Sequence, residues 1–280
     1  MEYTLQKVNW GNIGEAVCVE EETLPNSCYL RDNSDYFLNK TKGELTLVLS
    51  GDEPVGIGKL SLLPDGSGWL ETLRVRPDWQ GQGVGKAIYN RWLKEAQQLG
   101  CPAVRMFTGT KNVRSRGLAE RFGLSVAGTY IGATAKIPDR ELYLPRGFMP
   151  VTDYRLARTL LESGRWEMED FIVMNNTFFR CGEKTWRYVW EQGMVFADAQ
   201  YNFVVIGARM LRQRGLHVAM YGGDGRRCLQ FAKAYTQRQG LPAVTVSYPP
   251  QNEKIRAELE RDGFAHDRSC RIVMERILEK

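Results

Sequence analysis

The stretch LRVRPDWQGQGVG, Leu73 to Gly85, joins a strand pattern to a helix pattern through a loop that holds three glycines. Before the loop, residues 69–75 alternate between two faces, with Leu73 and Val75 on one of them. After it, apolar residues recur at helical spacing until Gly100 supplies a stop signal. These apolar residues are Val84, Ile88, Trp92, Ala96 and Leu99. A glycine loop at a helix N-terminus presents backbone N–H groups, so this junction suits a pyrophosphate.

Two common phosphate-binding motifs do not fit this loop. The dinucleotide pattern G-x-G-x-x-G, started at Gly81, needs a glycine where Lys86 stands. The P-loop pattern G-x-x-x-x-G-K-[ST] needs a hydroxyl residue where Ala87 stands. The remaining pattern is Q-x-x-G-x-G, formed by Gln80, Gly83 and Gly85.

The same stretch resembles the signature V-x-P-x-x-[QR]-x-x-G-x-[GA] of the GNAT superfamily of acyl-CoA-dependent N-acyltransferases. Every fixed position of that signature is met. These positions are Val75, Pro77, Gln80, Gly83 and Gly85. The resemblance implies direct transfer of an acyl group from a CoA thioester to an amine, with acetyl-CoA as the expected cosubstrate. An ordinary strand-to-helix turn is the alternative interpretation of these residues.

A related stretch lies 140 residues downstream: residues 99–124 align without a gap on residues 239–264. The identities include the Pro-Ala-Val triplets that begin at Pro102 and Pro242, and they include Asn112 with Asn252. Each copy predicts a strand, a loop that ends in asparagine, a helix and a glycine stop. The resemblance identifies this pattern as the later half of a GNAT fold, where two parted strands admit the pantetheine arm.

The predicted fold class is therefore α/β of the α+β type, with two tandem GNAT folds. Each fold is expected to hold a mixed, largely antiparallel sheet flanked by helices. We predict an N-terminal domain over 1–140 that binds acyl-CoA and is catalytic, and a degenerate GNAT-like domain over 151–280. The stretch Lys136–Pro150, which holds three prolines, is the predicted boundary.

The second copy of the glycine loop differs at one position that matters for an anion. The offset places Gly83 over Gly223, but it places Gln80 over Met220 and Val84 over Asp224. A carboxylate within a phosphate-binding loop repels the phosphate. We therefore expect that the second domain keeps the fold and has lost acyl-CoA binding. A plain glycine turn is the alternative interpretation of the second loop.

The resemblance also implies roles for residues on both sides of the glycines. Backbone N–H groups of the loop would hold the pyrophosphate, with Lys86 adding positive charge. Main-chain groups at the end of the preceding strand would contact the acyl and pantetheine units. Asn112 matches the family asparagine that opens the next helix and contacts the cofactor arm, and a simple helix N-cap is its alternative role. The expected cofactor-binding residues are Leu73, Arg74, Val75, Gln80, Gly81, Gln82, Gly83, Val84, Gly85, Lys86 and Asn112.

Glu71 is the candidate general base. It alternates in phase with Leu73 and Val75, and the resemblance implies that a carboxylate at this strand position removes the proton of the acceptor amine. The alternative is a structural glutamate paired with an arginine such as Arg74 or Arg105.

The residue at the position of the family's general acid differs from the family pattern. The tyrosine that commonly protonates the leaving thiolate has its place at Ala119. Ser115 and Tyr130 are the two candidate replacements. Unassisted departure is the third possibility, because a thiol of pKa about 8.5 is a tolerable leaving group.

Composition excludes several other classes of site. The chain has 280 residues, of which 43% are hydrophobic and 25% charged, which is typical of a globular protein with one large domain or two ordinary ones. The only histidines are His217 and His266, so the first half of the chain contains none. This argues against a Ser-His-Asp or Cys-His mechanism near Gly83. The six cysteines form no C-x-x-C pair, so we expect buried free thiols, no disulfide framework and no metal site.

Charge and hydropathy bear on partners and location. No apolar run is long enough to span a bilayer, and the acidic start MEYTLQKVNW lacks the pattern of a secretory signal, so we expect a cytoplasmic protein without a membrane partner. The net charge of +5 is mild and predicts no nucleic-acid partner. The densest basic stretch, Arg209 to Arg214, is explained equally well by a turn at Gly215.

These observations predict an N-acetyltransferase that moves an acetyl group from acetyl-CoA to an amine, a small molecule rather than a protein. The second domain would shape the acceptor site or stabilise the first domain. A non-catalytic acyl-CoA-binding sensor or interaction protein is the alternative, because Ala119 removes a familiar catalytic group. A nucleic-acid or ribosome-associated modifier is a third hypothesis.

Overall fold

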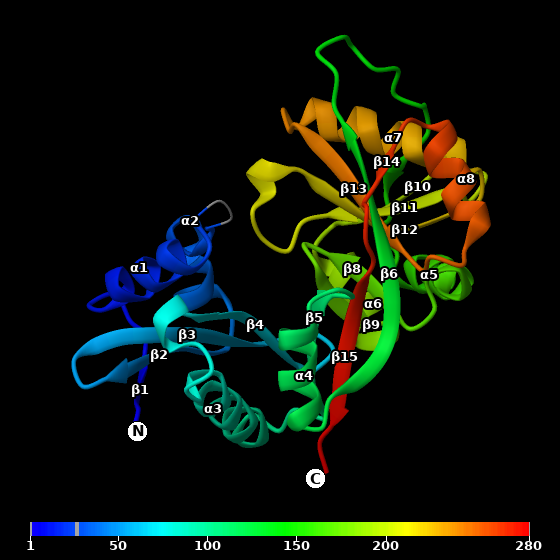
Figure 1. Ribbon diagram of the computed structural model, residues 1–280. Helices are drawn as coiled ribbons and strands as arrows, with labels where there is room; N and C mark the ends of the chain where they lie inside the picture. Colours follow the sequence, from blue (N-terminus) through cyan, green and yellow to red (C-terminus); the bar gives the residue numbers. More distant parts are fainter. Residues whose placement is uncertain (1, 26–27, 280) are drawn as a thin grey trace. The chain divides into compact units, whose positions relative to one another are not determined.

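The computed structural model describes residues 2–25 and 28–279, and contacts group them into two compact units (Figure 1). Unit 1 consists of Met1–Met106, Asn112–Ser125 and Met274–Lys280. Unit 2 consists of Phe107–Lys111 and Val126–Val273.

The first half of the chain contains most of the elements of unit 1. The elements of this half are β1 (Thr4–Lys7), α1 (Ile13–Thr23), α2 (Leu30–Asp35), the π-helix η1 (Tyr36–Lys40), β2 (Gly43–Ser50), β3 (Glu53–Leu62), β4 (Gly68–Val75), the 3-10 helix η2 (Pro77–Trp79), α3 (Val84–Gln98), β5 (Ala103–Gly109), α4 (Val113–Arg121) and β6 (Ser125–Lys136). After Ser125, strand β6 belongs to unit 2.

The second half continues the alternation of helices and strands. Its elements are β7 (Met149–Pro150), α5 (Tyr154–Met168), β8 (Phe171–Met174), β9 (Thr177–Arg180), α6 (Glu183–Glu191), β10 (Val195–Ala197), β11 (Phe203–Gly207), the 3-10 helix η3 (Arg212–Arg214), β12 (Leu216–Gly222), α7 (Gly225–Arg238), β13 (Ala243–Tyr248), α8 (Glu253–Arg261), β14 (Ala265–His266) and β15 (Arg271–Ile277).

In unit 1 the strand order is β1-β2-β3-β4-β5, with β15 beside β5. Neighbours from β1 to β4 are antiparallel, whereas β4 and β5 are parallel. Helix α3 packs against β3, where a Cβ on Gly58 would lie 2.5 Å from a side-chain atom of Ile88. Glycine therefore lets helix and sheet approach closely. The predicted helix and its stop are confirmed, because α3 spans Val84–Gln98 and Gly100 follows with φ of 66°.

In unit 2 the order is β6-β13-β12-β11-β10-β7, with β14 beside β6. Strands β12 and β13 are parallel, and the other pairs are antiparallel. Strands β8 and β9 form a separate hairpin. The fully buried side chains of Phe171, Phe178, Phe179 and Trp186 lie in the core of this unit. The predicted class, with two mixed, largely antiparallel sheets flanked by helices, is confirmed.

The internal repeat is visible in the element bounds. Helix α4 spans Val113–Arg121 and α8 spans Glu253–Arg261, so their ends differ by the offset found in the sequence. The preceding asparagines cap both helices: Asn112 accepts from Ser115 N, and Asn252 accepts from Ile255 N, each at 3.1 Å. The shared cap shows that the two stretches have the same local structure.

The compact units do not follow the repeat, because three strands, β5, β6 and β15, have residues in both units. After Ser125 the strand β6 belongs to unit 2, where residues 131–136 pair antiparallel with β13. Strand β15 begins in unit 2, but from Met274 onward it belongs to unit 1. The repeat division into 1–140 and 151–280 therefore describes the duplicated sequence, whereas each unit takes a terminal strand from the other copy.

Candidate active site

The glycine loop leads into the first turn of α3, whose N–H groups have no backbone acceptor among the described residues. Gly81 has φ of 83° and Gly83 has φ of 100°, a region that favours glycine. The first backbone hydrogen bond of the helix runs from Ala87 N to Gly83 O at 3.0 Å. Among the described residues, the N–H groups of residues 84–86 therefore have no backbone acceptor. A Cβ on Gly81 or Gly83 would meet no atom within 4 Å, so the space beside the loop is open.

The glutamine side chains of the loop tie it to its own surroundings. Gln80 donates from Nε2 to the carbonyl of Val75 at 3.1 Å, which links the loop to the end of β4. Gln80 also accepts from the guanidinium of Arg114 on α4. Gln82 donates to the carbonyl of Asp78 at 2.7 Å, and its own carbonyl accepts from the hydroxyl of Tyr3 at 3.0 Å. The motif glutamine thus fixes the loop conformation.

A bulge in β4 changes the predicted alternation of side chains. Ile57 of β3 pairs with Arg74, and Lys59 pairs with Glu71, so two residues of β4 lie opposite a single residue of β3. Within the bulge Thr72 has φ of 58°, an uncommon conformation for a β-branched residue. The prediction that Glu71 is in phase with Leu73 is therefore wrong, because the bulge puts Glu71 on the face of Arg74.

The parallel strands β4 and β5 separate after two paired residues. Their register contains only Gly68 with Val104 and Trp69 with Arg105. Leu73, Arg74 and Val75 lie beyond this point and are half-buried. The corresponding pair in unit 2 separates in the same way, with β12 and β13 paired over three residues. Parted strands expose main-chain groups to a ligand, as the family resemblance implies.

Glu71 is buried, with 9% of its surface exposed. The hydroxyl of Ser61 donates to its carboxylate at 2.6 Å, and the fully buried Lys59 lies opposite it in register. Lys59 donates from Nζ to the carbonyl of Phe37 at 2.9 Å. Arg105, the other alternative partner, forms ion pairs with Asp65 and Glu275, each at 2.6 Å. Ser61 thereby orients the candidate base.

Tyr29 adds a hydroxyl beside the bulge that the sequence did not single out. Its hydroxyl lies 2.9 Å from Oγ1 of Thr72, and the Arg74 guanidinium lies 5.9 Å from its ring centre. Burial raises the pKa of Tyr29, although the nearby Arg74 lowers it. Arg74 donates to the carbonyl of Leu73 at 3.0 Å, and its Nε is buried without a hydrogen-bond partner in the described part of the chain.

The residues proposed for the acid side fall in different environments. Ser115 lies half-buried in the first turn of α4, and Ala119 on the same helix is fully buried. Tyr130 belongs to unit 2, where its hydroxyl donates to the carbonyl of Met168 at 2.9 Å and burial raises its pKa. Asn112 is exposed and caps α4. The structure thus gathers Ser115 and Asn112 with the loop in unit 1, but it does not include Tyr130.

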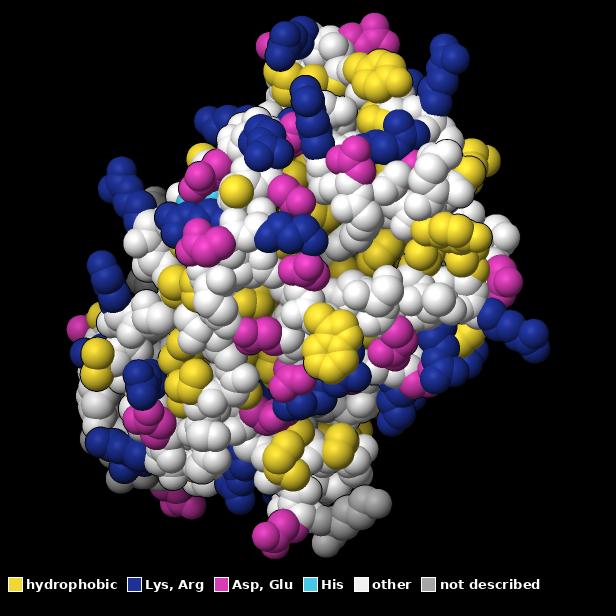
Figure 2. All heavy atoms as spheres, turned by 90° about the vertical axis from the view of Figure 1, so that its right-hand side faces the viewer, with side chains coloured by type: hydrophobic (Ala, Val, Ile, Leu, Met, Phe, Trp, Pro, Cys, Tyr) yellow, Lys and Arg dark blue, Asp and Glu magenta, His cyan; other side chains and the backbone are white. Residues whose placement is uncertain are grey.

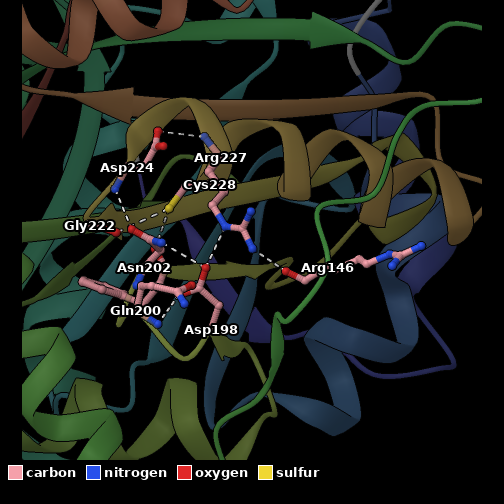
Figure 3. Close-up of polar contacts among 9 residues, drawn as sticks. Arg146, Asp198, Gln200, Asn202, Gly222, Asp224, Arg227 and Cys228 are labelled. Atoms are coloured by element: carbon pink, nitrogen blue, oxygen red, sulfur yellow. Dashed lines mark hydrogen bonds and ion pairs between the residues drawn. The ribbon is translucent and has the colours of Figure 1, made fainter.

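The second glycine loop is closed by the side chain of Asp224 and by side chains from other segments of unit 2 (Figure 3). Asp224 is the N-cap of α7, and its carboxylate accepts from Arg227 N at 3.1 Å. The backbone N–H of Asp224 donates to Oδ1 of Asn202 at 2.7 Å. Asp198 accepts from Nε of Arg227 at 2.7 Å and from Nδ2 of Asn202 at 2.9 Å. Burial alone would raise the pKa of Asp198, but these hydrogen bonds lower it.

Side chains also fill the space that is open in the first loop. A Cβ on Gly223 would lie 2.3 Å from Oδ1 of Asn202, and a Cβ on Gly225 would lie 2.3 Å from a carboxylate oxygen of Glu258. Two carboxylates, from Asp224 and Glu258, therefore lie at the N-terminus of α7. A helix N-terminus favours negative charge, so the chain supplies internally the anion that the first loop lacks.

The remaining titratable groups indicate no further chemistry in the described residues. Burial raises the pKa of Cys181 and of Cys228 to about 12, and Cys101 is also buried. The prediction of buried thiols holds for these three, whereas Cys18 is exposed. No group of three His, Cys, Asp or Glu side chains is placed to hold a metal ion in the part of the chain described. Over the same residues, no helix has both the length and the apolar composition that crossing a membrane requires.

The basic stretch at Arg209 to Arg214 has a structural explanation. Arg209 is buried and donates to Oγ1 of Thr177 at 2.8 Å, and Arg212 donates to Gln239 at 2.9 Å. Gly215 ends η3 with φ of 136°. Figure 2 shows acidic and basic side chains interspersed over the face it presents, which is unlike a nucleic-acid footprint.

Comparisons with known proteins agree with this geometry. The model of the acetyltransferase (GNAT) family matches residues 14–124. The mycothiol acetyltransferase of Propionibacterium freudenreichii subsp. shermanii is 33% identical over 74 residues, which are 26% of this chain and 24% of that relative. The chain therefore matches only about a quarter of the length of this curated relative.

Two solved structures share the fold over nearly the whole chain. A GCN5-related N-acetyltransferase from Sphaerobacter thermophilus has a TM-score of 0.66 at 12% identity, covering 99% of this chain and 96% of that one. A tandem GNAT protein from the clavulanic acid biosynthesis pathway has a TM-score of 0.64 at 12% identity, covering 100% and 99%. Residues 14–124 thus belong to the GNAT acetyltransferase family, and the chain has the fold of a tandem GNAT protein.

Proposed function

We propose that this protein is an acetyl-CoA-dependent N-acetyltransferase whose reaction takes place in unit 1. The observation that carries the proposal is the open glycine loop at the start of α3, on the same unit as the buried carboxylate of Glu71. The acceptor is a small molecule with an amine. A cytoplasmic location and the absence of nucleic-acid partners stay predictions from the sequence.

The loop fits a pyrophosphate by shape and by charge. Its free N–H groups at residues 84–86 point out of a helix N-terminus, where the helix dipole favours an anion. Lys86 is exposed in the first turn and adds a positive charge. The contacts of Gln80 and Gln82 hold the loop in this form before any ligand arrives. Main-chain groups of residues 73–75 and the exposed Asn112 extend the same site toward the parted strands.

Acetyl-CoA supplies an acetyl thioester, and Glu71 manages the proton of the attacking amine. The amine proton moves to a carboxylate oxygen of Glu71 as the nitrogen lone pair forms the new C–N bond. The C–S bond breaks and its electron pair leaves on sulfur. The hydroxyl of Ser61 donates to one carboxylate oxygen of Glu71 at 2.6 Å and so orients the carboxylate. The bulge at Thr72 places Glu71 and Arg74 on one face, so the acceptor approaches a surface that bears both charges.

Ser115 is the proposed proton donor to the departing thiolate. It lies in the first turn of α4, on the same unit as the loop. The N-cap bond to Asn112 uses the backbone N–H of Ser115 and not its hydroxyl. Ala119 cannot act as a general acid, because its methyl side chain has no ionisable group. Tyr130 is assigned a structural role, because its hydroxyl is used by the carbonyl of Met168.

The test is thiol release from acetyl-CoA against a panel of small primary amines. Glu71→Gln is expected to lower kcat by about 100-fold to 10,000-fold, the range for a lost general base. Glu15→Gln changes an exposed glutamate on α1 and is the matched control, with activity unchanged.

Acetyl-CoA binding separates this proposal from the sensor hypothesis. The enzyme proposal predicts that Glu71→Gln still binds acetyl-CoA while turnover falls. Tight binding of acetyl-CoA by the wild type, with no thiol release for any amine of the panel, would favour the non-catalytic sensor that Ala119 suggests.

A further inference from the structure

Unit 2 contains a cavity of about 570 Å³ where its parallel strands part. One face of α5 lines it, with Leu156, Leu160, Ser163 and Glu167 at helical spacing. The end of β12 contributes Tyr221 and Gly223, and α8 contributes residues 254, 255 and 258. The cavity therefore lies beside the closed glycine loop of the second copy.

The position of this cavity is that of an acyl-CoA site, but its lining is different. By the repeat offset Gly223 corresponds to Gly83, whereas Glu258 corresponds to Leu118. Asp224 and Glu258 lie at the N-terminus of α7, where a pyrophosphate would need free N–H groups. Unit 2 thus keeps a cavity at this position, but carboxylates of the chain lie where a pyrophosphate would bind.

The charges facing the cavity are unequal. Glu167 accepts from Nδ2 of Asn252 at 2.7 Å and from Nζ of Lys254 at 2.9 Å, so its charge is matched. Glu258 accepts from the hydroxyl of Tyr221 at 2.8 Å. Among the described residues no ion pair to Glu258 is formed, although Lys254 on the same helix is close enough to interact with it electrostatically. The lining thus holds two carboxylates and one ammonium group, an excess of one negative charge.

The rest of the lining is apolar or aromatic. Leu156, Leu160 and Ile255 form an apolar wall, and the side chains of Phe203, Tyr201 and Tyr221 also line the cavity. Aromatic rings beside a carboxylate favour an organic ammonium, because the ring faces attract a cation. The apolar wall suits a hydrocarbon body attached to that ammonium.

We propose that this cavity is a second ligand site, which takes a small amphipathic primary amine with its ammonium at Glu258. The site does not depend on the reaction proposed for unit 1. It is distinct from the acyl-CoA loop, since every residue that lines it belongs to unit 2.

Calorimetric titration of the full chain without acetyl-CoA tests this site. The probes are phenethylammonium, the neutral 2-phenylethanol and the anionic 3-phenylpropionate, which share a similar apolar body. We expect the ammonium to bind at least about tenfold more tightly than the alcohol, because a hydrogen bond to a charged group is stronger than a neutral one. Binding of the carboxylate should be weaker still. Equal affinity for the three probes, or no binding of the ammonium, would overturn the proposal.

Two variants locate the bound amine. Glu258→Gln should weaken phenethylammonium binding by about tenfold, because the amide keeps the shape and loses the charge. Glu260→Gln, an exposed position on the same helix, should leave it unchanged. Thr159→Trp places a large side chain on the exposed α5 wall of the cavity and should abolish binding in a chain that still melts cooperatively.

Arg158→Trp adds the same side chain one residue earlier, outside the cavity lining, and is the control for Thr159→Trp. Wild-type affinity in both Glu258→Gln and Thr159→Trp would place the amine elsewhere and contradict the proposal.

Discussion

The two glycine loops show how one structural motif is kept with two different electrostatic solutions. In the first loop the N–H groups before α3 are free and a Cβ on Gly83 would face open space. In the second loop Asp224 caps α7, and Asn202 fills the space beside Gly223. Both helices need negative charge at their N-termini. One is built to receive it from a ligand, and the other receives it from the chain.

The comparison teaches that a loop's function depends on which groups satisfy its N–H donors. Glycines with left-handed φ occur in both loops, at Gly83 and at Gly223. Local backbone form is therefore shared. The decisive difference is the set of side chains that approach from other elements, including Asn202 and Glu258.

The largest expected effect comes from removing the end of β15, the segment of the second copy that belongs to unit 1. Truncation after Val273 removes the part of β15 that belongs to unit 1, including the buried Met274 and the Glu275 that pairs with Arg105. Losing one partner of a buried ion pair alone costs about 3 to 5 kcal/mol. We expect unit 1 to unfold and acetyl-CoA binding to be lost, while unit 2 stays protected in hydrogen exchange.

The full-length variant Glu275→Gln is the graded version of that experiment. It keeps the strand and leaves Arg105 with Asp65, so a smaller loss of stability is expected. If truncation left unit 1 as protected as in the intact chain, the assignment of β15 to unit 1 would be contradicted.

The parallel strand pairs differ in their response to acid. Unit 1 carries Trp69 and Arg105 at the paired positions, whereas unit 2 carries His217 paired with Thr245. Burial, aided by Arg271, lowers the pKa of His217 from 6.5 to about 4. The unfolded chain therefore binds the proton more readily, so stability is fully present above pH 6.5 and is lost as pH falls toward 4.

This linkage amounts to at most about 3 kcal/mol over the window. His217→Asn should show a smaller loss of unfolding free energy between pH 6.5 and pH 4 in denaturant titrations. Identical pH dependence of the variant and the wild type would show that His217 does not carry the effect.

Alanine at Gly83 and at the equivalent Gly223 should have different effects, on acetyl-CoA affinity in the first loop and on protein stability in the second. Gly83→Ala forces a left-handed φ on alanine in open space, at a cost of about 1 kcal/mol, and disturbs the loop where the pyrophosphate binds. We expect its affinity for acetyl-CoA to fall by about tenfold or more. Gly223→Ala adds a Cβ 2.3 Å from Asn202, so its unfolding free energy should fall by more than that of Gly83→Ala, by about 1 to 3 kcal/mol. The reverse order of the two stabilities would contradict the packing difference.

The smallest expected effect is at the basic residue that follows each loop. Lys86→Ala removes a charge from the first turn of α3 and should weaken acetyl-CoA binding by about threefold, with the difference disappearing at high salt. Arg226→Ala makes the equivalent change in the second copy and should have no effect on this affinity. Equal losses in both variants would indicate that both loops bind the ligand.

The sequence predicted those parts of the site whose structure depends on residues that are close together in the chain. The spacing of Val84, Ile88 and Trp92 gave α3, and the repeated asparagines gave the caps of α4 and α8. The bulge at Thr72 was missed because the sequence of β4 alternates regularly and carries no glycine there.

Long-range pairing explains the remaining differences. Strands β6 and β15 lie outside the stretches in which the sequence pattern predicted strands, and their pairing partners are far away in the sequence, so the exchange between the units could not be predicted. Tyr29 and Ser61 reach the β4 bulge from other elements, and Glu258 reaches Gly225 from α8. Besides Asp224, the repeat alignment carries two signals that the second loop differs, the replacement of Gln80 by Met220 and of Leu118 by Glu258.

The most direct test of the central claim is the number of acetyl-CoA molecules bound per chain, measured by native mass spectrometry at saturating ligand. We predict one molecule in the wild type, with occupancy sharply reduced in Gly83→Ala. Two molecules per chain, or a single molecule that persists undiminished in Gly83→Ala, would contradict the conclusion that the first loop alone holds the ligand.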